Sequence, residues 1–344
     1  MSQELQRRGV ALSYCLEKAE PSVSVRVVDI RVLSIRKIGA FFQTMSALRA
    51  SFRETDIIHV FDPVPYGILA TIANIGLKKP IVINAFGTYA LFQRGRPLKN
   101  ALIRWTYRKA AAIIVVSDFV RSQIEKDGFH LPPFTIIPVG VDVERFSADT
   151  RNTQVASLPS SYILSVGGLK ERKGFRTTIQ AFAKVADAFP SLQLVIIGKD
   201  FHDGYKEELI RLVEEKGVMD RVHFFSGLSD EELRAAYAHA ELFVLCPITT
   251  ESAIEGFGMV YLEANTAGLP VVGTKNTGAE AAIQDGVNGF LAEGNPEDVS
   301  EKIRNILAHP ELRERMSRGG KQYVQNFTWA NVAQMTIDVY NKIL

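Results

Sequence analysis

The sequence predicts an α/β protein of two domains, each built around a parallel β-sheet. Short apolar runs alternate with stretches of helical period along both halves of the chain. A polar segment without a clear period, residues 140–160, separates the two halves. The length of 344 residues, of which 47% are hydrophobic, is sufficient for two domains with separate cores.

The first half begins with the end of a helix at residues 2–8, which Gly9 stops. Apolar, β-branched runs then predict strands at residues 10–14, 24–29, 57–61, 80–84, 112–117 and 134–138. Helical patterns lie between them at residues 39–53, 66–75, 98–109 and 119–126. Strands that alternate with helices form a parallel sheet covered on both faces.

The second half repeats this alternation. Strands are predicted at residues 162–167, 193–198, 222–225, 242–245 and 270–273, with helices at residues 177–189 and 230–239 among the intervening stretches. Three of these ranges end in glycine, and two of these glycines, Gly167 and Gly198, end the first two strands of this half. Because ligands of such sheets bind beyond the carboxyl ends of the strands, we expect a site at these ends.

The most informative stretch is residues 255–264, which lies between two apolar strands and predicts a loop followed by a helix. Gly256 and Gly258 flank Phe257, so the backbone can approach a ligand closely, and the first N–H groups of the helix are free to bind an anion, most naturally a phosphate. Glu263 lies on this otherwise apolar helix, where a ligand with hydroxyl groups would satisfy its charge. Glu255, at the start of the helix, has the simpler reading of a partner for the helix dipole.

The order of these residues, Glu255, Gly-Phe-Gly, apolar helix, Glu263 and then Ala-Gly-Leu-Pro-Val-Val, resembles the Glu-x7-Glu motif of retaining glycosyltransferase family 4. The resemblance implies a GT-B fold of two facing Rossmann-like domains. It also implies that Glu255 lies beside the donor sugar and that Glu263 holds the ribose of the nucleotide. Phe257, Gly258, Met259 and Val260 would contact sugar and diphosphate.

From this resemblance we expect three segments. Residues 1–150 form the acceptor-side domain, residues 151–325 form the nucleotide-sugar domain, and residues 326–344 form a helix that packs back toward the first domain. Family members open with a strand and a glycine-rich loop, and residues 1–8 contain neither. The first domain is therefore expected to lack its opening strand, which leaves an open position in its sheet beside residues 10–14.

Residues 167–174 place flexible backbone and three cations after the first strand of the second half. The family has Gly-Arg, a short gap and Lys-Gly here, with the Arg and the Lys holding the donor diphosphate. Lys173 matches the Lys, whereas Gly168 follows Gly167 at the place of the Arg, so Arg172 or Lys170 remain as alternative cations. Glu255 and Lys173 are the expected catalytic residues.

The first half offers three acceptor-side candidates. Phe86 and Gly87, after the strand at residues 80–84, resemble the family's His-Gly-Thr loop with Phe86 in place of the His. A phenylalanine cannot donate a hydrogen bond to a sugar, but it can pack on a pyranose face. His59, near another strand end, has either a structural or an acceptor-side role.

The charge distribution is asymmetric, because residues 1–150 carry 20 Lys and Arg against 13 Asp and Glu, and the remainder carries 20 against 25. A local excess of cations is either a face for anionic lipid headgroups or the solvated side of a helix. These cations are Arg94, Arg96, Lys99, Arg104, Arg108 and Lys109. Nucleic acid is not expected as a partner, since no binding motif accompanies the charge.

Several classes of protein are excluded or disfavoured. No apolar run reaches the roughly 18 residues of a membrane span and no leader opens the chain, so we expect a cytoplasmic protein, with peripheral contact at the inner membrane face as an option. Cys15 and Cys246 are too few for a disulfide framework. No Asp-x-Asp or histidine cluster predicts a metal, no Ser-His-Asp set predicts a hydrolase, and no Gly-x-Gly-x-x-Gly predicts a nicotinamide enzyme.

The resemblance therefore implies a metal-independent hexosyltransferase without a bound cofactor. It would move a sugar from a nucleotide diphosphate donor, with retention, to a hydroxyl of a glycan, a lipid-linked acceptor or a small molecule. The alternative is a nucleotide-sugar-binding partner subunit that turns over weakly or not at all, which the departures at Gly168 and Phe86 motivate.

Overall fold

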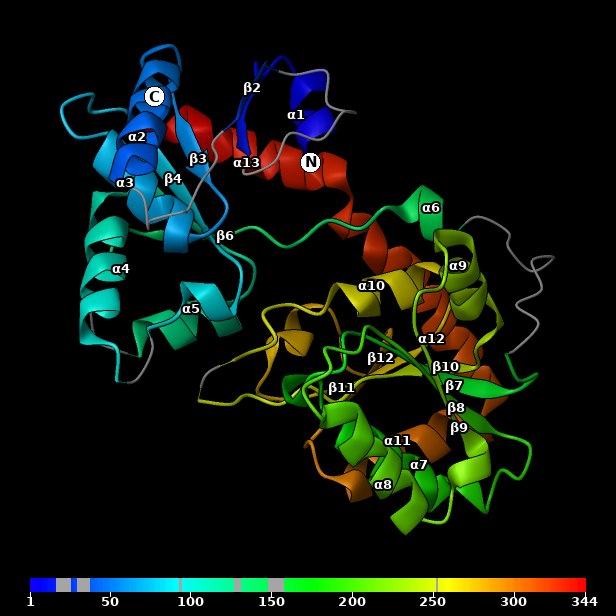
Figure 1. Cartoon of the computed structure of the whole chain (residues 1–344). Coiled ribbons are helices and arrows are strands. Elements are labelled where there is room, and N and C mark those ends of the chain that lie inside the picture. Colours follow the sequence, from blue (N-terminus) through cyan, green and yellow to red (C-terminus); the bar gives the residue numbers. More distant parts are fainter. Residues whose placement is uncertain (17–25, 30–37, 93–94, 127–130, 148–157, 252) are drawn as a thin grey trace. The chain divides into compact units, whose positions relative to one another are not determined.

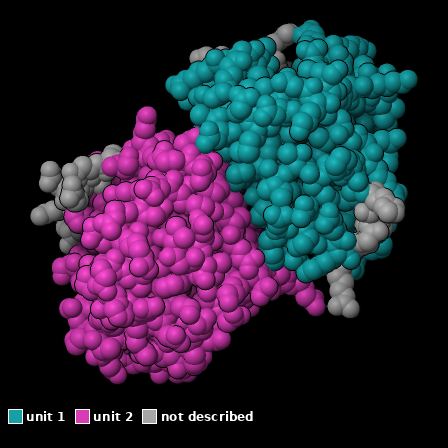
Figure 2. Space-filling view, turned by 180° about the vertical axis from the view of Figure 1, so that it is seen from behind, with its two compact units in different colours: residues 1–138, 329–344 teal, residues 139–328 magenta. Residues whose placement is uncertain are grey.

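The computed structural model describes residues 1–16, 26–29, 38–92, 95–126, 131–147, 158–251 and 253–344 (Figure 1). The chain forms two compact units (Figure 2). Unit 1 comprises Met1–Pro138 and Trp329–Leu344, and unit 2 comprises Val139–Thr328. Each unit contains a parallel sheet with helices, as the sequence predicts.

The main sheet of unit 1 has four parallel strands in the order β3-β4-β5-β6. They are β3 (Ile58–Val60), β4 (Ile81–Ala85), β5 (Ala112–Val115) and β6 (Phe134–Ile136). Every residue of β4 and β5 is buried, which explains why these strands read as continuous apolar runs instead of alternating ones. A separate parallel pair is formed by β1 (Ser13–Leu16) and β2 (Arg26–Asp29).

The helices and turns of unit 1 connect these strands. They are α1 (Ser2–Arg7), α2 (Ile38–Arg53), the π-helical turn η1 (Pro63–Gly67), α3 (Ile68–Ala73), the 3-10 turn η2 (Thr88–Ala90), α4 (Pro97–Lys109), α5 (Asp118–Glu125) and α13 (Trp329–Ile343). The last helix belongs to unit 1 because Val332, Val339 and Tyr340 pack with Val82 and Ile114 of the sheet. One long helix expected at residues 66–75 is instead η1 followed by α3.

The edge of β3 faces a gap in the sheet. Among the described strands, β1 pairs with β2 alone and β3 pairs with β4 alone. A cavity of about 480 Å³ lies here, lined by residues 9–12, by residues 54–57 with His59 and Phe61, and by parts of α1 and α13. Within the described ranges no strand therefore pairs with the free edge of β3, and the open position expected beside residues 10–14 stays a prediction. The strand expected from residue 10 begins at Ser13.

Unit 2 has a six-stranded parallel sheet in the order β12-β11-β10-β7-β8-β9. Its strands are β7 (Tyr162–Val166), β8 (Gln193–Ile197), β9 (Val222–Phe225), β10 (Leu242–Val244), β11 (Val271–Thr274) and β12 (Gly289–Ala292). The strands β7, β8 and β9 lie side by side in chain order. The next strand, β10, pairs with β7 on the side opposite to β8. This reversal places a topological switch point between β7 and β10, where doubly wound sheets bind ligands.

The helices and turns of unit 2 are α6 (Val143–Ser147), η3 (Glu171–Lys173), α7 (Phe175–Ala186), α8 (Tyr205–Glu215), η4 (Met219–Arg221), α9 (Asp230–His239), α10 (Met259–Thr266), η5 (Gly278–Ala281), α11 (Pro296–Ala308), α12 (Pro310–Tyr323) and η6 (Val324–Phe327). Within the segment expected to be a linker, residues 143–147 form the short helix α6 and residues 148–157 lie outside the described part.

No helix in the described part of the chain has the length and hydropathy of a membrane span.

Candidate nucleotide-sugar site

The loops that follow β7 and β10 meet at the switch point of unit 2. The first loop leads from Gly167 into η3, and the second leads from β10 to α10. The backbone N–H of Ile248 in the second loop donates to the carbonyl of Arg172 in the first, at 2.9 Å. This hydrogen bond ties together two segments that are far apart in the sequence, so side chains from both can form one site.

Glu255 lies between two cations at this point. Arg172 Nη1 and Lys173 Nζ are each 2.6 Å from Glu255 Oε2. The side chains of Glu255 and Lys173 are only 11% and 12% exposed, so the charge of each would be costly without the other. Two cations surround one carboxylate, which leaves an excess positive charge at the carboxyl end of β7.

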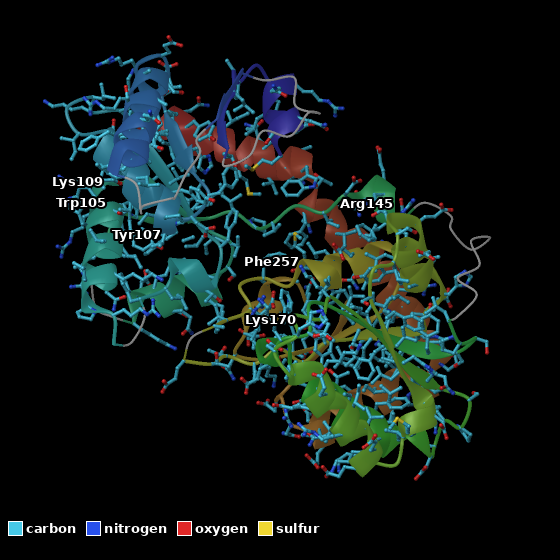
Figure 3. All side chains as sticks on the ribbon, in the orientation of Figure 1. Trp105, Tyr107, Lys109, Arg145, Lys170 and Phe257 are labelled. Carbon is cyan, nitrogen blue, oxygen red and sulfur yellow. The ribbon has the colours of Figure 1, made fainter. Side chains whose placement is uncertain are left out.

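The helix α10 begins beside this cluster. Gly258 precedes the helix with a φ of 84°, and a Cβ on this residue would lie 2.6 Å from the Tyr261 ring. No side chain caps the helix, so its first N–H groups are directed at whatever occupies the site. Phe257 is buried and packs on Phe327 with ring centroids 5.8 Å apart, which anchors the loop, whereas Met259 is 43% exposed (Figure 3).

Glu263 has a partner that the sequence did not reveal. Tyr237 Oη donates to Glu263 Oε2 at 2.8 Å. Burial raises the pKa of the Glu263 carboxyl, while the Tyr237 hydrogen bond and the charges of Arg145 and Lys173 oppose this rise. Arg145, on α6, is itself paired with Asp230. The carboxylate therefore has a hydrogen-bond partner, whereas its position on an apolar helix had suggested an unpaired charge.

The two alternative cations of the first loop lie in different places. Arg172 joins the Glu255 cluster, whereas Lys170 Nζ lies 4.1 Å from the centroid of the Phe201 ring. A Cβ on Gly168 would lie 2.9 Å from Cε2 of the same ring. Phe201 thus fills the space beside Gly168, and Arg172 is the cation that accompanies Lys173.

The acceptor-side candidates belong to unit 1. His59 Nε2 lies 2.9 Å from Asn84 Oδ1, and His59 Nδ1 lies 2.5 Å from Tyr340 Oη. Because the amide oxygen only accepts, Nε2 carries the proton and Nδ1 accepts from the tyrosine. Burial lowers the pKa of His59 to about 4, so the ring is neutral and joins β3, β4 and α13. Phe86 and Gly87 follow β4, where Gly87 has open space beside it.

No group of three or more His, Cys, Asp and Glu residues in the described ranges is arranged to hold a metal ion. The free thiol of Cys246 is buried at the end of β10, and burial raises its pKa to about 12. It therefore stays protonated and acts as a small core side chain. Cys15 lies in β1.

Comparison with known proteins identifies similar chains. A family model described as "Glycosyl transferases group 1" matches residues 148–323, and one described as "Glycosyltransferase Family 4" matches residues 1–145. A D-inositol 3-phosphate glycosyltransferase of Corynebacterium urealyticum is 29% identical over 248 residues, which cover 68% of this chain and 57% of that protein. A GDP-mannose-dependent alpha-(1-6)-phosphatidylinositol monomannoside mannosyltransferase of Mycolicibacterium smegmatis is 28% identical over 277 residues, which cover 77% and 71%.

A solved structure has the same fold. The crystal structure of Anabaena Alr3699/HepE in complex with UDP matches with a TM-score of 0.76 and 19% identity, and the match covers 87% of this chain and 82% of that one. At this identity the likeness concerns the fold. The prediction of two Rossmann-like domains of the GT-B type is confirmed.

Proposed function

Because the chain belongs to the glycosyl transferases group 1 family, as the Glu-x7-Glu motif predicted, we propose that it transfers a hexose from a nucleotide diphosphate sugar to an acceptor hydroxyl with retention of configuration. The single observation that carries this proposal is Glu255 held between Arg172 and Lys173 at the carboxyl end of β7. A cluster with excess positive charge beside an uncapped helix is suited to a diphosphate.

Donor binding would rearrange this cluster by exchanging anions. The diphosphate takes over Arg172 and Lys173 and accepts from the first N–H groups of α10. Glu255 then turns from these cations to the hydroxyl groups of the sugar. Glu263, still hydrogen-bonded by Tyr237, accepts from the ribose hydroxyls. Each of these groups, which are paired with one another within the chain, therefore acquires a partner on the donor.

The transfer itself follows the front-face route in this proposal. The bond between the anomeric carbon and the diphosphate oxygen breaks, and the acceptor oxygen forms its bond on the same face of the sugar. The acceptor proton passes to the departing phosphate, so no enzymic nucleophile is needed. Lys173, Arg172 and the α10 N-terminus stabilise the negative charge that develops on the leaving group. Because these groups supply positive charge, we expect transfer to persist in EDTA.

The relatives narrow the choice of substrates to test. Their names specify inositol phosphate or phosphatidylinositol mannoside as acceptor type and, in one case, GDP-mannose as donor, while the structural neighbour was solved with UDP. These names support a polyol or lipid-linked polyol acceptor for this chain. They also favour an active transferase over a binding subunit without turnover.

The proposal is tested by donor binding followed by turnover. UDP, GDP and ADP sugars are screened by thermal shift, since a ligand at 100 times its Kd adds about 2.7 kcal/mol to the free energy of unfolding. The stabilising donors are then incubated with inositol phosphate and sugar acceptors, and glycosylated product is measured by mass spectrometry. A chain that no nucleotide sugar stabilises contradicts the proposal, and binding without product favours the partner-subunit alternative.

A peripheral contact with anionic membrane is a further part of the proposal. Residues 63–117 contain eight Lys and Arg but no Asp or Glu. On α4, Leu98 is 75% exposed and Leu102 is 38% exposed, and Trp105 follows on the same side one turn later. Figure 3 shows Trp105 and Lys109 on the outer side of this helix. An apolar strip among cations on one exposed helix fits a membrane interface.

The predicted cationic face is only partly exposed. Arg96, Arg108 and Lys109 are exposed, whereas the Arg104 guanidinium lies over the Phe92 ring at 5.7 Å. Arg94 lies outside the described residues. Sedimentation with vesicles of phosphatidylcholine alone or with added phosphatidylserine tests the contact. Leu98→Ser combined with Leu102→Ser should abolish binding to the anionic vesicles, and equal binding of variant and wild type would refute this use of α4.

A further inference from the structure

Tyr237 is the fixed end of the hydrogen bond to Glu263. Its side chain on α9 is fully buried, and its ring stacks on Phe243 of β10 with 5.9 Å between centroids and 26° between planes. The Phe146 ring of α6 makes a T-shaped contact with the same ring at 5.6 Å and 89°. Because two neighbouring rings hold Tyr237, the hydroxyl group that donates to Glu263 Oε2 at 2.8 Å has a fixed position.

This hydroxyl group also favours the charged form of Glu263. Burial raises the pKa of Tyr237 well above its ordinary value, so the hydroxyl keeps its proton and donates it. Burial raises the pKa of the Glu263 carboxyl as well, and the Tyr237 hydrogen bond is the strongest effect that opposes this rise. The charges of Arg145 and Lys173 act in the same direction as the hydrogen bond, and that of Asp230 acts against it.

The hydrogen bond also sets the direction of the whole carboxylate. Both oxygens lie in one rigid plane, so a partner on Oε2 largely fixes where Oε1 points. Among the described residues, the structure shows a hydrogen bond to Glu263 through Oε2 alone, and the residue is not fully buried. Glu263 lies about 7.5 Å from Gly258 along α10, because an α-helix rises about 1.5 Å per residue. A nucleotide with its diphosphate at the start of α10 can therefore bring its ribose to Glu263.

We propose that Tyr237 is the positioning residue for ribose recognition: by holding Glu263 Oε2 it directs Oε1 at the ribose hydroxyls, and it thereby sets the preference for a ribonucleotide over a deoxyribonucleotide. Tyr237 does not touch the nucleotide in this arrangement. A side chain that is oriented before binding loses less conformational freedom, and an oriented carboxylate rejects a sugar that lacks the expected hydroxyl. The inference rests on the proposed function, because it takes the nucleotide to bind at α10.

The experiment compares the affinities of ribonucleotides and deoxyribonucleotides. Isothermal titration of the full chain measures the Kd of UDP, GDP and ADP and of the 2′-deoxy and 3′-deoxy forms of each. The wild type should prefer the ribonucleotide about tenfold or more over at least one deoxy form, as expected for a hydrogen bond to a charged group. Tyr237→Phe keeps the ring and removes only the hydroxyl group. Its preference should fall to about threefold or less, because only the ribonucleotide binds more weakly.

Tyr162→Phe is the matched control. Tyr162 is also fully buried, and its hydroxyl group donates at 2.7 Å to the carbonyl of Ala236, which precedes Tyr237 on α9. This variant loses a buried tyrosine hydroxyl of the same unit without removing a partner of Glu263. It should keep the wild-type preference for ribose, whereas an effect of general packing would change the preference in both tyrosine variants.

Glu263→Gln provides a second variant that leaves the tyrosine intact. Its amide has a single oxygen, which accepts from Tyr237, so the uncharged NH2 group faces the ribose and the preference should also fall. The inference is overturned if Tyr237→Phe or Glu263→Gln keeps the wild-type preference, if Tyr162→Phe loses it, or if the wild type binds both kinds of nucleotide equally. Nucleotide binding and the proposed function survive each of these outcomes, whereas a wild type that binds no nucleotide overturns both.

Discussion

Glu263 carries the most specific prediction for a single residue of the candidate site. Its carboxylate accepts from Tyr237 and is largely buried on α10. We expect Glu263→Ala to weaken donor binding by roughly 1.5 to 3 kcal/mol, the scale of hydrogen bonds to a charged group. Glu214→Gln, on the exposed side of α8, is the control. Isothermal titration with the donor nucleotide measures both, and an unchanged affinity in folded Glu263→Ala would remove Glu263 from the site.

His59 should make the free energy of unfolding depend on pH. Burial lowers its pKa to about 4, below the value of about 6.5 for an unfolded chain. As the pH falls through this interval, the unfolded chain takes up a proton that the native chain does not, so the free energy of unfolding decreases by at most about 3 kcal/mol. Urea unfolding between pH 7 and pH 4 should show this loss. His59→Gln should lack that part of the dependence, and His239→Gln, which replaces an exposed histidine, should keep it.

At the residue scale, sequence patterns predicted the candidate site groups but not the partners that these groups have within the chain. Glu255, Lys173 and Glu263 were recognisable because a motif fixes their spacing. The hydrogen bonds from Tyr237 to Glu263 and from Tyr340 to His59 join residues 26 and 281 positions apart. Nothing in the local sequence marks such pairs, because they arise only when separate elements pack together.

The β7–α7 loop allows two lysines of one loop to be compared. Lys173 binds Glu255 at 2.6 Å, whereas Lys170 lies over the Phe201 ring. Lys173→Ala should therefore reduce donor affinity and turnover more than Lys170→Ala, and the difference should shrink at high salt because it is electrostatic. Steady-state kinetics of the two variants checks this. A larger defect in Lys170→Ala would mean that the diphosphate binds nearer to Phe201 than to Glu255.

The start of α10 requires glycine at position 258 because the backbone has a positive φ and because the Tyr261 ring leaves no room for a Cβ. The two effects can be measured separately. Gly258 has a φ of 84° and no room for a Cβ beside Tyr261, whereas Gly204, which precedes α8, has a φ of 88° and open space. Gly204→Ala should cost about 1 kcal/mol for the backbone conformation alone. Gly258→Ala should cost about 2 to 4 kcal/mol, since overpacking against the ring adds to it. Equal urea midpoints for the two variants would show that Tyr261 moves aside freely.

At the element scale, prediction succeeded where one pattern decides the structure. Strands buried on both faces, such as β4 and β5, and the helices α4 and α9 lie within a few residues of their predicted bounds. The prediction of element bounds failed where the sequence contains signals for two different structures. Pro63 and Pro65 turn the expected start of a single helix into η1 before α3 begins, and the strand expected from residue 10 starts only at Ser13.

For the whole molecule, the alternation of strands and helices was enough to predict two parallel-sheet domains. It did not give the strand order, and the switch point between β7 and β10 depends on that order. The predicted division at residues 150 and 325 differs from the units seen, which divide after Pro138 and after Thr328. A polar linker marks a boundary only to within its own length, whereas packing of Val332 and Val339 against the sheet assigns α13 to unit 1.

The central claim is that this chain transfers a hexose from a nucleotide sugar with retention, and product stereochemistry tests it most directly. The wild type and Lys173→Ala are incubated with the stabilising α-linked nucleotide sugar and its acceptor, and the anomeric proton of the product is observed by NMR. The account predicts an α-linked product from the wild type and strongly reduced formation of the same product by Lys173→Ala. A β-linked product, or equal turnover by the two proteins, would contradict it.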